Sequence, residues 1–136
     1  YYKPELPLNL TKYLLKFANS SIDVSDGLID DLAKMINRQS LSFHLFENKI
    51  PVSNKLSNLI KKQRLNKINL ISNGDDYQVL FTADIKKARI IQKASKTTGI
   101  KITKIGKIVS GKDRSLIFDE KGKQIRAKSK GYIHRF

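Results

Sequence analysis

Residues 23–28 read Asp23-Val24-Ser25-Asp26-Gly27-Leu28, and two further aspartates, Asp30 and Asp31, follow closely. This stretch is acidic in a chain of 136 residues that has 12 Asp and Glu against 27 Lys and Arg, a formal net charge of +15. Carboxylates held together repel one another by about 1–4 kcal/mol per pair at ~4 Å. A hard cation such as magnesium relieves that repulsion. The stretch is therefore the first candidate for a functional site.

The same stretch marks a predicted change from strand to helix. Residues 22–24 are expected to be extended, and a helix is predicted to begin at Ser25 or Asp26 and to run to about Gln39, because its apolar residues recur at intervals of three and four. Ser and Asp are favoured helix caps, and acidic residues gain about 0.3–1 kcal/mol in a first helical turn. Capping is thus one interpretation of the motif.

A second interpretation is functional. Asp23 and Asp26 would face a metal-bound phosphate, while the Ser25 hydroxyl and nearby backbone N–H groups would donate to its oxygens. Gly27 would let the ligand approach the backbone closely. From the residues alone both interpretations stay open. Asp30 and Asp31 are expected on the surface of the helix.

Elsewhere helices and strands alternate, which indicates an α+β fold. A first helix is predicted over 8–19, broken at 19–21, and Asp84 is expected to cap a helix that Gly99 ends. Ser53 is a candidate cap for a further helix across 56–60. Alternating apolar residues predict strands, and turn residues at 119–122 predict a hairpin. The predicted strands cover 41–45, 77–81, 100–109, 116–118 and 124–127.

The composition excludes several classes of protein. Without cysteine there are no disulfides and no thiolate metal sites, and His44 and His134 lie far apart. No run approaches the roughly 20 apolar residues of a membrane span, and no signal-peptide pattern opens the chain, so a cytoplasmic protein with no membrane partner is expected. The chain starts at Tyr1 and its one methionine is Met35, so we expect a piece of a longer protein.

The positive charge is spread along the chain, without a dense block of like charges and without a nucleic-acid motif. A solvated basic surface is the favoured interpretation, ahead of attraction for small anions and of nucleic-acid binding. No nucleic-acid partner is expected.

Two further segments combine acidic and aromatic residues. Ser72–Tyr77 contains Asn-Gly-Asp, which is turn chemistry, and it precedes a predicted strand. Asp75 and Asp76 should point in opposite directions and so differ in role. In the tail 131–136, the Tyr132 ring either packs as an anchor or stacks on a flat ligand.

Together these segments resemble the thiamine-monophosphate kinases, in order and spacing, over almost the whole chain. The resemblance is to the carboxy-terminal half of that family. It rests on residues 23–28, 74–82 and 104–108, and on Gly131-Tyr132 with His134.

The resemblance implies an α/β/α layered domain with a mixed, mostly antiparallel sheet, partly ferredoxin-like. Residues 1–136 would form a single domain of a longer, two-domain enzyme. The amino-terminal domain, which is absent here, would supply most of the site for ATP and magnesium. The full-length protein would be a homodimer, and the fragment alone would be inactive.

The resemblance also implies roles for individual residues. The family transfers the γ-phosphoryl group of ATP directly, in line, onto thiamine monophosphate, giving thiamine diphosphate. Asp23 and Asp26 would bind Mg²⁺, Ser25 would contact ATP, and Asp75 and Tyr132 would bind the substrate. No catalytic nucleophile is expected.

The chain departs from the family pattern at three places. Asp75 stands where the family usually has Glu, Asn73 replaces a common glycine, and the tail after His134 is one residue longer than usual. Two alternatives therefore stay open. One is another ATP-using enzyme of the wider superfamily, which includes the aminoimidazole-ribotide synthetases, and the other is a non-catalytic, basic binding domain.

Overall fold

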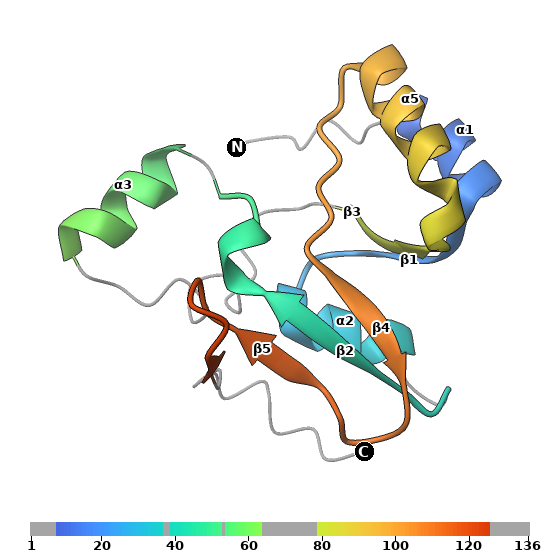
Figure 1. The fold of residues 1–136 in the computed structure, drawn as a ribbon. Coiled ribbons are helices and arrows are strands. Elements are labelled where there is room, and N and C mark those ends of the chain that lie inside the picture. The colour runs from blue at the N-terminus through green and yellow to red at the C-terminus, as the bar shows by residue number, and fades with distance from the viewer. Residues whose placement is uncertain (1–7, 37–38, 53, 64–78, 126–136) are drawn as a thin grey trace.

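The structure is a computed structural model that describes residues 8–36, 39–52, 54–63 and 79–125 (Figure 1). Helices and strands alternate along the chain, as expected. The helical elements are α1 (Leu8–Phe17), α2 (Leu28–Ile36), η1 (Glu47–Lys49), α3 (Asn54–Gln63), η2 (Ile85–Lys87) and α5 (Ala88–Thr98). The strands are β1 (Ala18–Asp23), β2 (Leu41–Phe46), β3 (Val79–Ala83), β4 (Gly106–Ser110), β5 (Leu116–Phe118) and β6 (Gln124–Ile125).

The described strands form two sheets. β1 and β3 make an antiparallel pair that runs from Ala18 opposite Ala83 to Asp23 opposite Val79. The second sheet has the order β4-β2-β5-β6, in which β2 and β5 are parallel and the other pairs antiparallel. The α+β class, with mixed and mostly antiparallel pairing, is confirmed, as is the predicted hairpin between β5 and β6.

The hydrophobic core lies between α2 and the four-stranded sheet. The predicted spacing of three and four places the apolar residues of α2 on one buried face, against the inward side chains of β2. Each such side chain contributes about 1.5–3 kcal/mol when it is fully buried. The core residues are Val24, Leu28, Ile29, Leu32, Ile36, Phe43, Leu45, Ile50 and Ile117.

Helices α1 and α5 lie side by side next to the β1–β3 pair (Figure 1). Phe17 at the end of α1 packs on Phe81 of β3, with ring centroids 5.3 Å apart. The Asp84 side chain accepts a hydrogen bond from the Lys86 amide at 2.9 Å, and Gly99, at φ 71°, ends α5 in the left-handed conformation. Both predicted helix ends are therefore confirmed.

Several predicted boundaries are wrong. The first helix ends at Phe17, two residues before the predicted end, and the strand begins at Ala18 rather than at Ile22. Residues 19–21 therefore belong to β1, where Ser20 Oγ and Thr82 Oγ1 share a hydrogen bond of 2.7 Å across the strands. Pairing across strands suits these hydroxyl side chains. Of the strand predicted over 100–109, residues 100–105 are not paired into a strand, and β4 covers only Gly106–Ser110.

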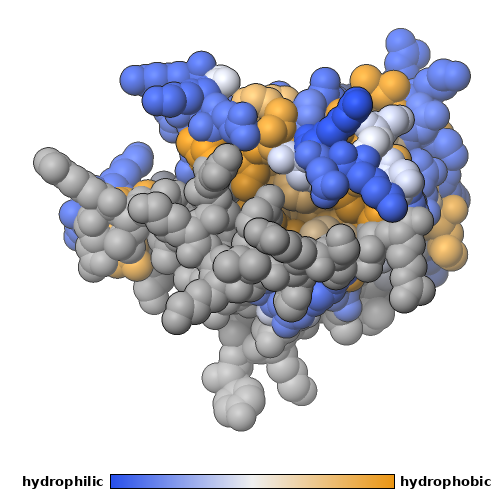
Figure 2. Space-filling view, turned by 90° about the horizontal axis from the view of Figure 1, so that it is seen from below, coloured by the Kyte–Doolittle hydropathy of each residue, from blue (hydrophilic) through white to orange (hydrophobic). Residues whose placement is uncertain are grey.

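None of the helices in the described ranges has the length and hydropathy that a membrane crossing requires. Seen from below, an apolar region lies between hydrophilic side chains on either side of it (Figure 2).

Candidate functional site

The acidic motif lies where β1 ends and α2 begins. Helix α2 starts at Leu28, two residues after the predicted Asp26, and its first backbone hydrogen bond runs from the Asp31 amide to the Gly27 carbonyl at 2.9 Å. Gly27 has a φ of 134°, which side-chain-bearing residues rarely adopt. The glycine therefore lets the chain turn from strand to helix without strain.

The late start of α2 changes the capping interpretation. The residue before the helix is Gly27, so neither Ser25 nor Asp26 stands in the N-cap position. The acidic residues of the first turn are Asp30 and Asp31. Residues 24–27 instead form a connection without regular structure, and the buried Asp31 side chain holds it in place through hydrogen bonds.

The Asp31 carboxylate is the central anchor of this connection. Its side chain was expected at the surface, and that is wrong: Asp31 is only 1% exposed. Its Oδ2 accepts hydrogen bonds from the amides of Ser25 at 2.7 Å and Asp26 at 3.0 Å. Asp31 is buried because backbone amides in a connection without regular structure need hydrogen-bond acceptors. A carboxylate is a stronger acceptor than a neutral group.

The same bonds correct a second expectation. The N–H groups of Ser25 and Asp26 are used inside the protein, so they are not available to a phosphate. The Ser25 hydroxyl remains as the candidate donor of this residue, and Ser25 is exposed.

The surroundings of Asp31 keep it ionised. Burial alone would raise the pKa of its carboxyl group, but the Ser25 and Asp26 amides and the nearby Lys34 together hold the pKa below its ordinary value of 3.8. The bonds to Asp26 and Asp31 in turn raise the pKa of the Lys34 ammonium. The connection is thus built around a fixed negative charge.

Lys34 joins the two carboxylates, and the sequence interpretation missed it. Its Nζ donates to Asp26 Oδ2 and, at 3.3 Å, to Asp31 Oδ1. The side chains of Lys34 and Asp26 are 44% and 62% exposed, whereas that of Asp31 is 2% exposed. The available signal was the spacing of Asp31 and Lys34, because residues three apart lie on one side of a helix.

Three predicted site residues lie on this connection or at the end of the strand before it. Asp23 ends β1 on its exposed side, and Ser25 and Asp26 are exposed two and three residues later. Asp75 and Tyr132, the predicted substrate residues, lie outside the described residues. Asp23 pairs with Val79, the first residue of the strand that follows the second acidic motif.

The donor set fits a magnesium ion that also binds a nucleotide. Within the described ranges, no group of three or more His, Cys, Asp or Glu side chains is arranged to hold a metal. Magnesium commonly takes one or two carboxylates and completes its shell with phosphate oxygens and water. Asp23 and Asp26 match that pattern as two exposed carboxylates three positions apart in the chain.

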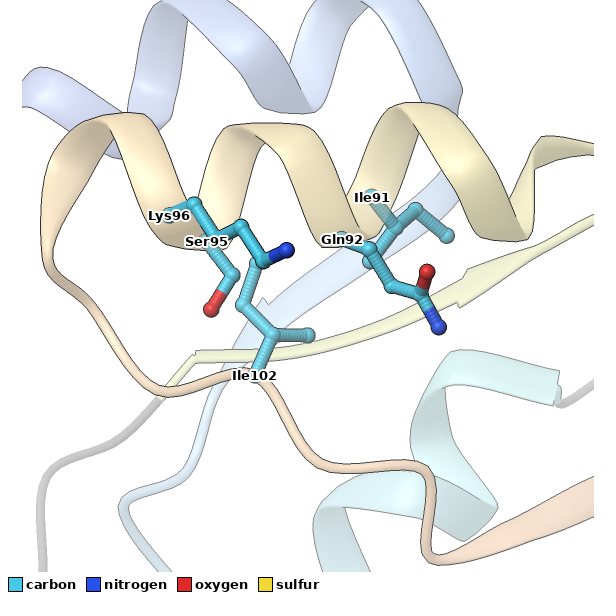
Figure 3. Close-up of a pocket in the computed structure, with 5 residues that line it drawn as sticks. All are labelled: Ile91, Gln92, Ser95, Lys96 and Ile102. Carbon is cyan, nitrogen blue, oxygen red and sulfur yellow. The ribbon is translucent and has the colours of Figure 1, made fainter.

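A separate cavity of about 380 Å³ lies beside α5. Its lining comes from one side of α5 and from the segment that follows the helix (Figure 3). It contains no carboxylate and no residue of the acidic motif, so it is not the phosphate site. The lining residues are Ile91, Gln92, Ser95, Lys96 and Ile102.

Comparison with known proteins identifies the relatives of this chain. No protein-family model matches it. A thiamine-monophosphate kinase from Buchnera aphidicola subsp. Acyrthosiphon pisum is 35% identical over 122 residues, which are 89% of this chain and 37% of that protein. This chain is a relative of the thiamine-monophosphate kinases. A kinase of the same name from Escherichia coli strain K12 is 30% identical over 89% of this chain.

Solved structures agree with the sequences. The thiamine-monophosphate kinase from Stenotrophomonas maltophilia K279a matches 82% of this chain and 34% of its own, with 27% identity and a TM-score of 0.68. The structure named AaThiL complexed with AMPPCP and TMP matches 92% of this chain and 37% of its own, with 28% identity and a TM-score of 0.66. This chain therefore spans little more than a third of the length of its thiamine-monophosphate kinase relatives.

Proposed function

We propose that residues 1–136 form the carboxy-terminal domain of a longer thiamine-monophosphate kinase. In this proposal the full-length protein transfers the γ-phosphoryl group of ATP to thiamine monophosphate and releases thiamine diphosphate. The observation that carries the proposal is the connection between β1 and α2. The Asp31 carboxylate holds it from inside, and Asp23, Ser25 and Asp26 are exposed on it. A related kinase structure contains an ATP analogue and TMP.

The geometry suits phosphoryl transfer because that reaction depends mainly on positioning and charge neutralisation. Asp23 and Asp26 would hold Mg²⁺, which neutralises phosphate charge when it is bound. The Ser25 hydroxyl would donate to a phosphate oxygen of ATP. The amino-terminal domain would complete the site, and the full-length protein would be a homodimer.

Substrate binding is assigned to Asp75 and Tyr132. An acidic group and an aromatic ring together suit the cationic heterocycle of thiamine. The pairing of Asp23 with Val79 supports a shared site, because it joins the strand that follows Asp75 in the sequence to the end of the first motif. Asp75 has a shorter side chain than the Glu usual in the family, so its reach toward the substrate would be shorter.

The test is a kinase assay on the full-length protein with Asp23→Asn and Asp26→Asn variants. Because each variant removes a charge that would hold Mg²⁺, kcat should fall by about 100-fold or more at saturating substrates, the scale found when one electrostatic contact to the transition state is lost. Asp84→Asn is the matched control. It makes the same charge change at the opposite end of the β1–β3 pair, and Asn caps as well as Asp does.

Wild-type turnover in both aspartate variants would contradict these roles. Efficient transfer to a different phosphate acceptor, with none to thiamine monophosphate, would indicate another enzyme of the superfamily. Residues 1–136 alone, assayed in parallel, should show no turnover.

A further inference from the structure

Lys34 occupies a position that the proposed magnesium role of Asp26 does not explain. It lies in the last turn of α2 and reaches back to Asp26, eight residues earlier, at the other end of the helix. Its ammonium therefore lies against the carboxylate that would hold the metal. The same ammonium contacts Asp31 Oδ1 at 3.3 Å.

The contacts of Lys34 with Asp31 and with Asp26 differ in their exposure to solvent. Asp31 is buried and tied to two amides, so its carboxylate is fixed. The pair of Lys34 with Asp26 is exposed to solvent on both sides, and exposed ion pairs are weak. Lys34 can therefore leave Asp26 at little cost, while Asp31 offers it a second carboxylate.

A divalent cation on Asp26 would stand next to this ammonium. The cation and the ammonium would repel each other, and both are attracted by the Asp26 carboxylate. Occupation by one therefore lowers the affinity for the other.

We propose that Lys34 is an internal counter-ion of Asp26, which a divalent cation must displace from that carboxylate in order to bind. Lys34 is thus a positioning residue that sets the concentration of Mg²⁺ needed to fill the site. This inference rests on the proposed role of Asp26 as a magnesium ligand. It adds that the chain itself carries a competitor for that metal.

The test is calorimetric titration of Mg²⁺ into the full-length protein, with a non-hydrolysable ATP analogue and without thiamine monophosphate. Lys34→Met keeps an unbranched side chain, one atom shorter than that of lysine, and removes its charge. It should lower the half-saturating Mg²⁺ concentration by about two- to five-fold, the range that corresponds to an exposed ion pair. Lys34→Arg keeps the charge and should leave that concentration near the wild-type value.

A second control separates the local contact from the general field of a basic protein. Lys93→Met makes the same charge change at an exposed position on α5 and should not alter the titration. Equal tightening in Lys93→Met and Lys34→Met would overturn the inference. So would unchanged or weaker Mg²⁺ binding in Lys34→Met, or Asp26→Asn that binds Mg²⁺ as tightly as the wild type.

The outcome is distinguishable from failure of the proposed function. A full-length protein that does not phosphorylate thiamine monophosphate refutes the function, yet its Mg²⁺ titration still reports on Lys34. Conversely, an active kinase whose Lys34→Met variant shows no tighter Mg²⁺ binding refutes only the inference.

Discussion

Two buried polar side chains, Asp31 and Ser42, hold two connections of the molecule in different ways. Each is 1% exposed, and each binds backbone groups of a segment without regular structure. Asp31 accepts hydrogen bonds from Ser25 and Asp26 before α2. Ser42 of β2 donates to the Gly111 carbonyl at 2.6 Å and accepts from the Arg114 amide at 3.0 Å, between β4 and β5.

The difference between the two is charge. The Ser42 hydroxyl gives one bond and accepts one, so its own hydrogen-bonding groups are satisfied by the backbone alone. The Asp31 carboxylate also attracts Lys34, which links the shape of the connection to the exposed Asp26. The neutral Ser42 thus only holds its connection in place. The charged Asp31 holds its connection in place and also attracts a cation to the exposed side of it.

Of the variants that compare the two anchors, Asp31→Ala should have the largest effect. The variant leaves the Ser25 and Asp26 amides without their acceptor, so the free energy of unfolding should fall by about 2–4 kcal/mol, because bonds to charged groups are the stronger ones. Displacement of the connection should also lower kcat of the full-length enzyme by about tenfold or more. Urea denaturation and the kinase assay measure the two effects. A loss of stability below about 0.5 kcal/mol, the range of ordinary surface substitutions, would contradict the anchoring role.

Ser42→Ala should have a smaller effect, confined to stability. The variant removes one neutral donor and acceptor, so the free energy of unfolding should fall by about 1–2 kcal/mol. The specific activity of the folded fraction should stay at the wild-type level, because Ser42 does not contact the acidic motif. Urea denaturation and the same kinase assay are again the measurements. A loss of activity as large as that of Asp31→Ala would remove the distinction between the two anchors.

The sequence predicts what short-range rules control. The spacing of apolar residues identifies α2, Asp84 and Gly99 mark the ends of the helical segment between them, and the turn residues at 119–122 identify the β5–β6 hairpin. It does not predict where β1 begins. The pairing of residues 18–23 with 79–83 decides that, and these partners are about 60 positions apart.

The same limit applies to the two anchors. Asp31 is three residues after Leu28 and four before Met35, so it lies on the apolar side of α2. This periodicity could have shown that its carboxylate points inward. Ser42 alternates with apolar residues, a pattern that places its side chain on the face opposite theirs. It is buried because β2 lies between β4 and β5 and because the 111–115 connection covers it, neither of which a local pattern reveals.

The smallest expected effect is a difference between the two anchors in how the stability of the metal-free protein depends on pH. The pKa of Asp31 is lower in the folded protein than its ordinary value of 3.8, so the unfolded chain binds the proton more readily. The stabilisation by this carboxylate is therefore fully present above about pH 4–5, above the unfolded pKa, and is lost as the pH falls through the lower, folded pKa. The measurement is urea denaturation in the presence of EDTA, repeated from pH 6 down to about pH 3. The free energy of unfolding of Asp31→Asn should fall less steeply with decreasing pH than that of wild type. Ser42→Ala should show the same dependence on pH as wild type. Identical slopes for wild type and Asp31→Asn would mean that the charge of Asp31 does not stabilise the fold.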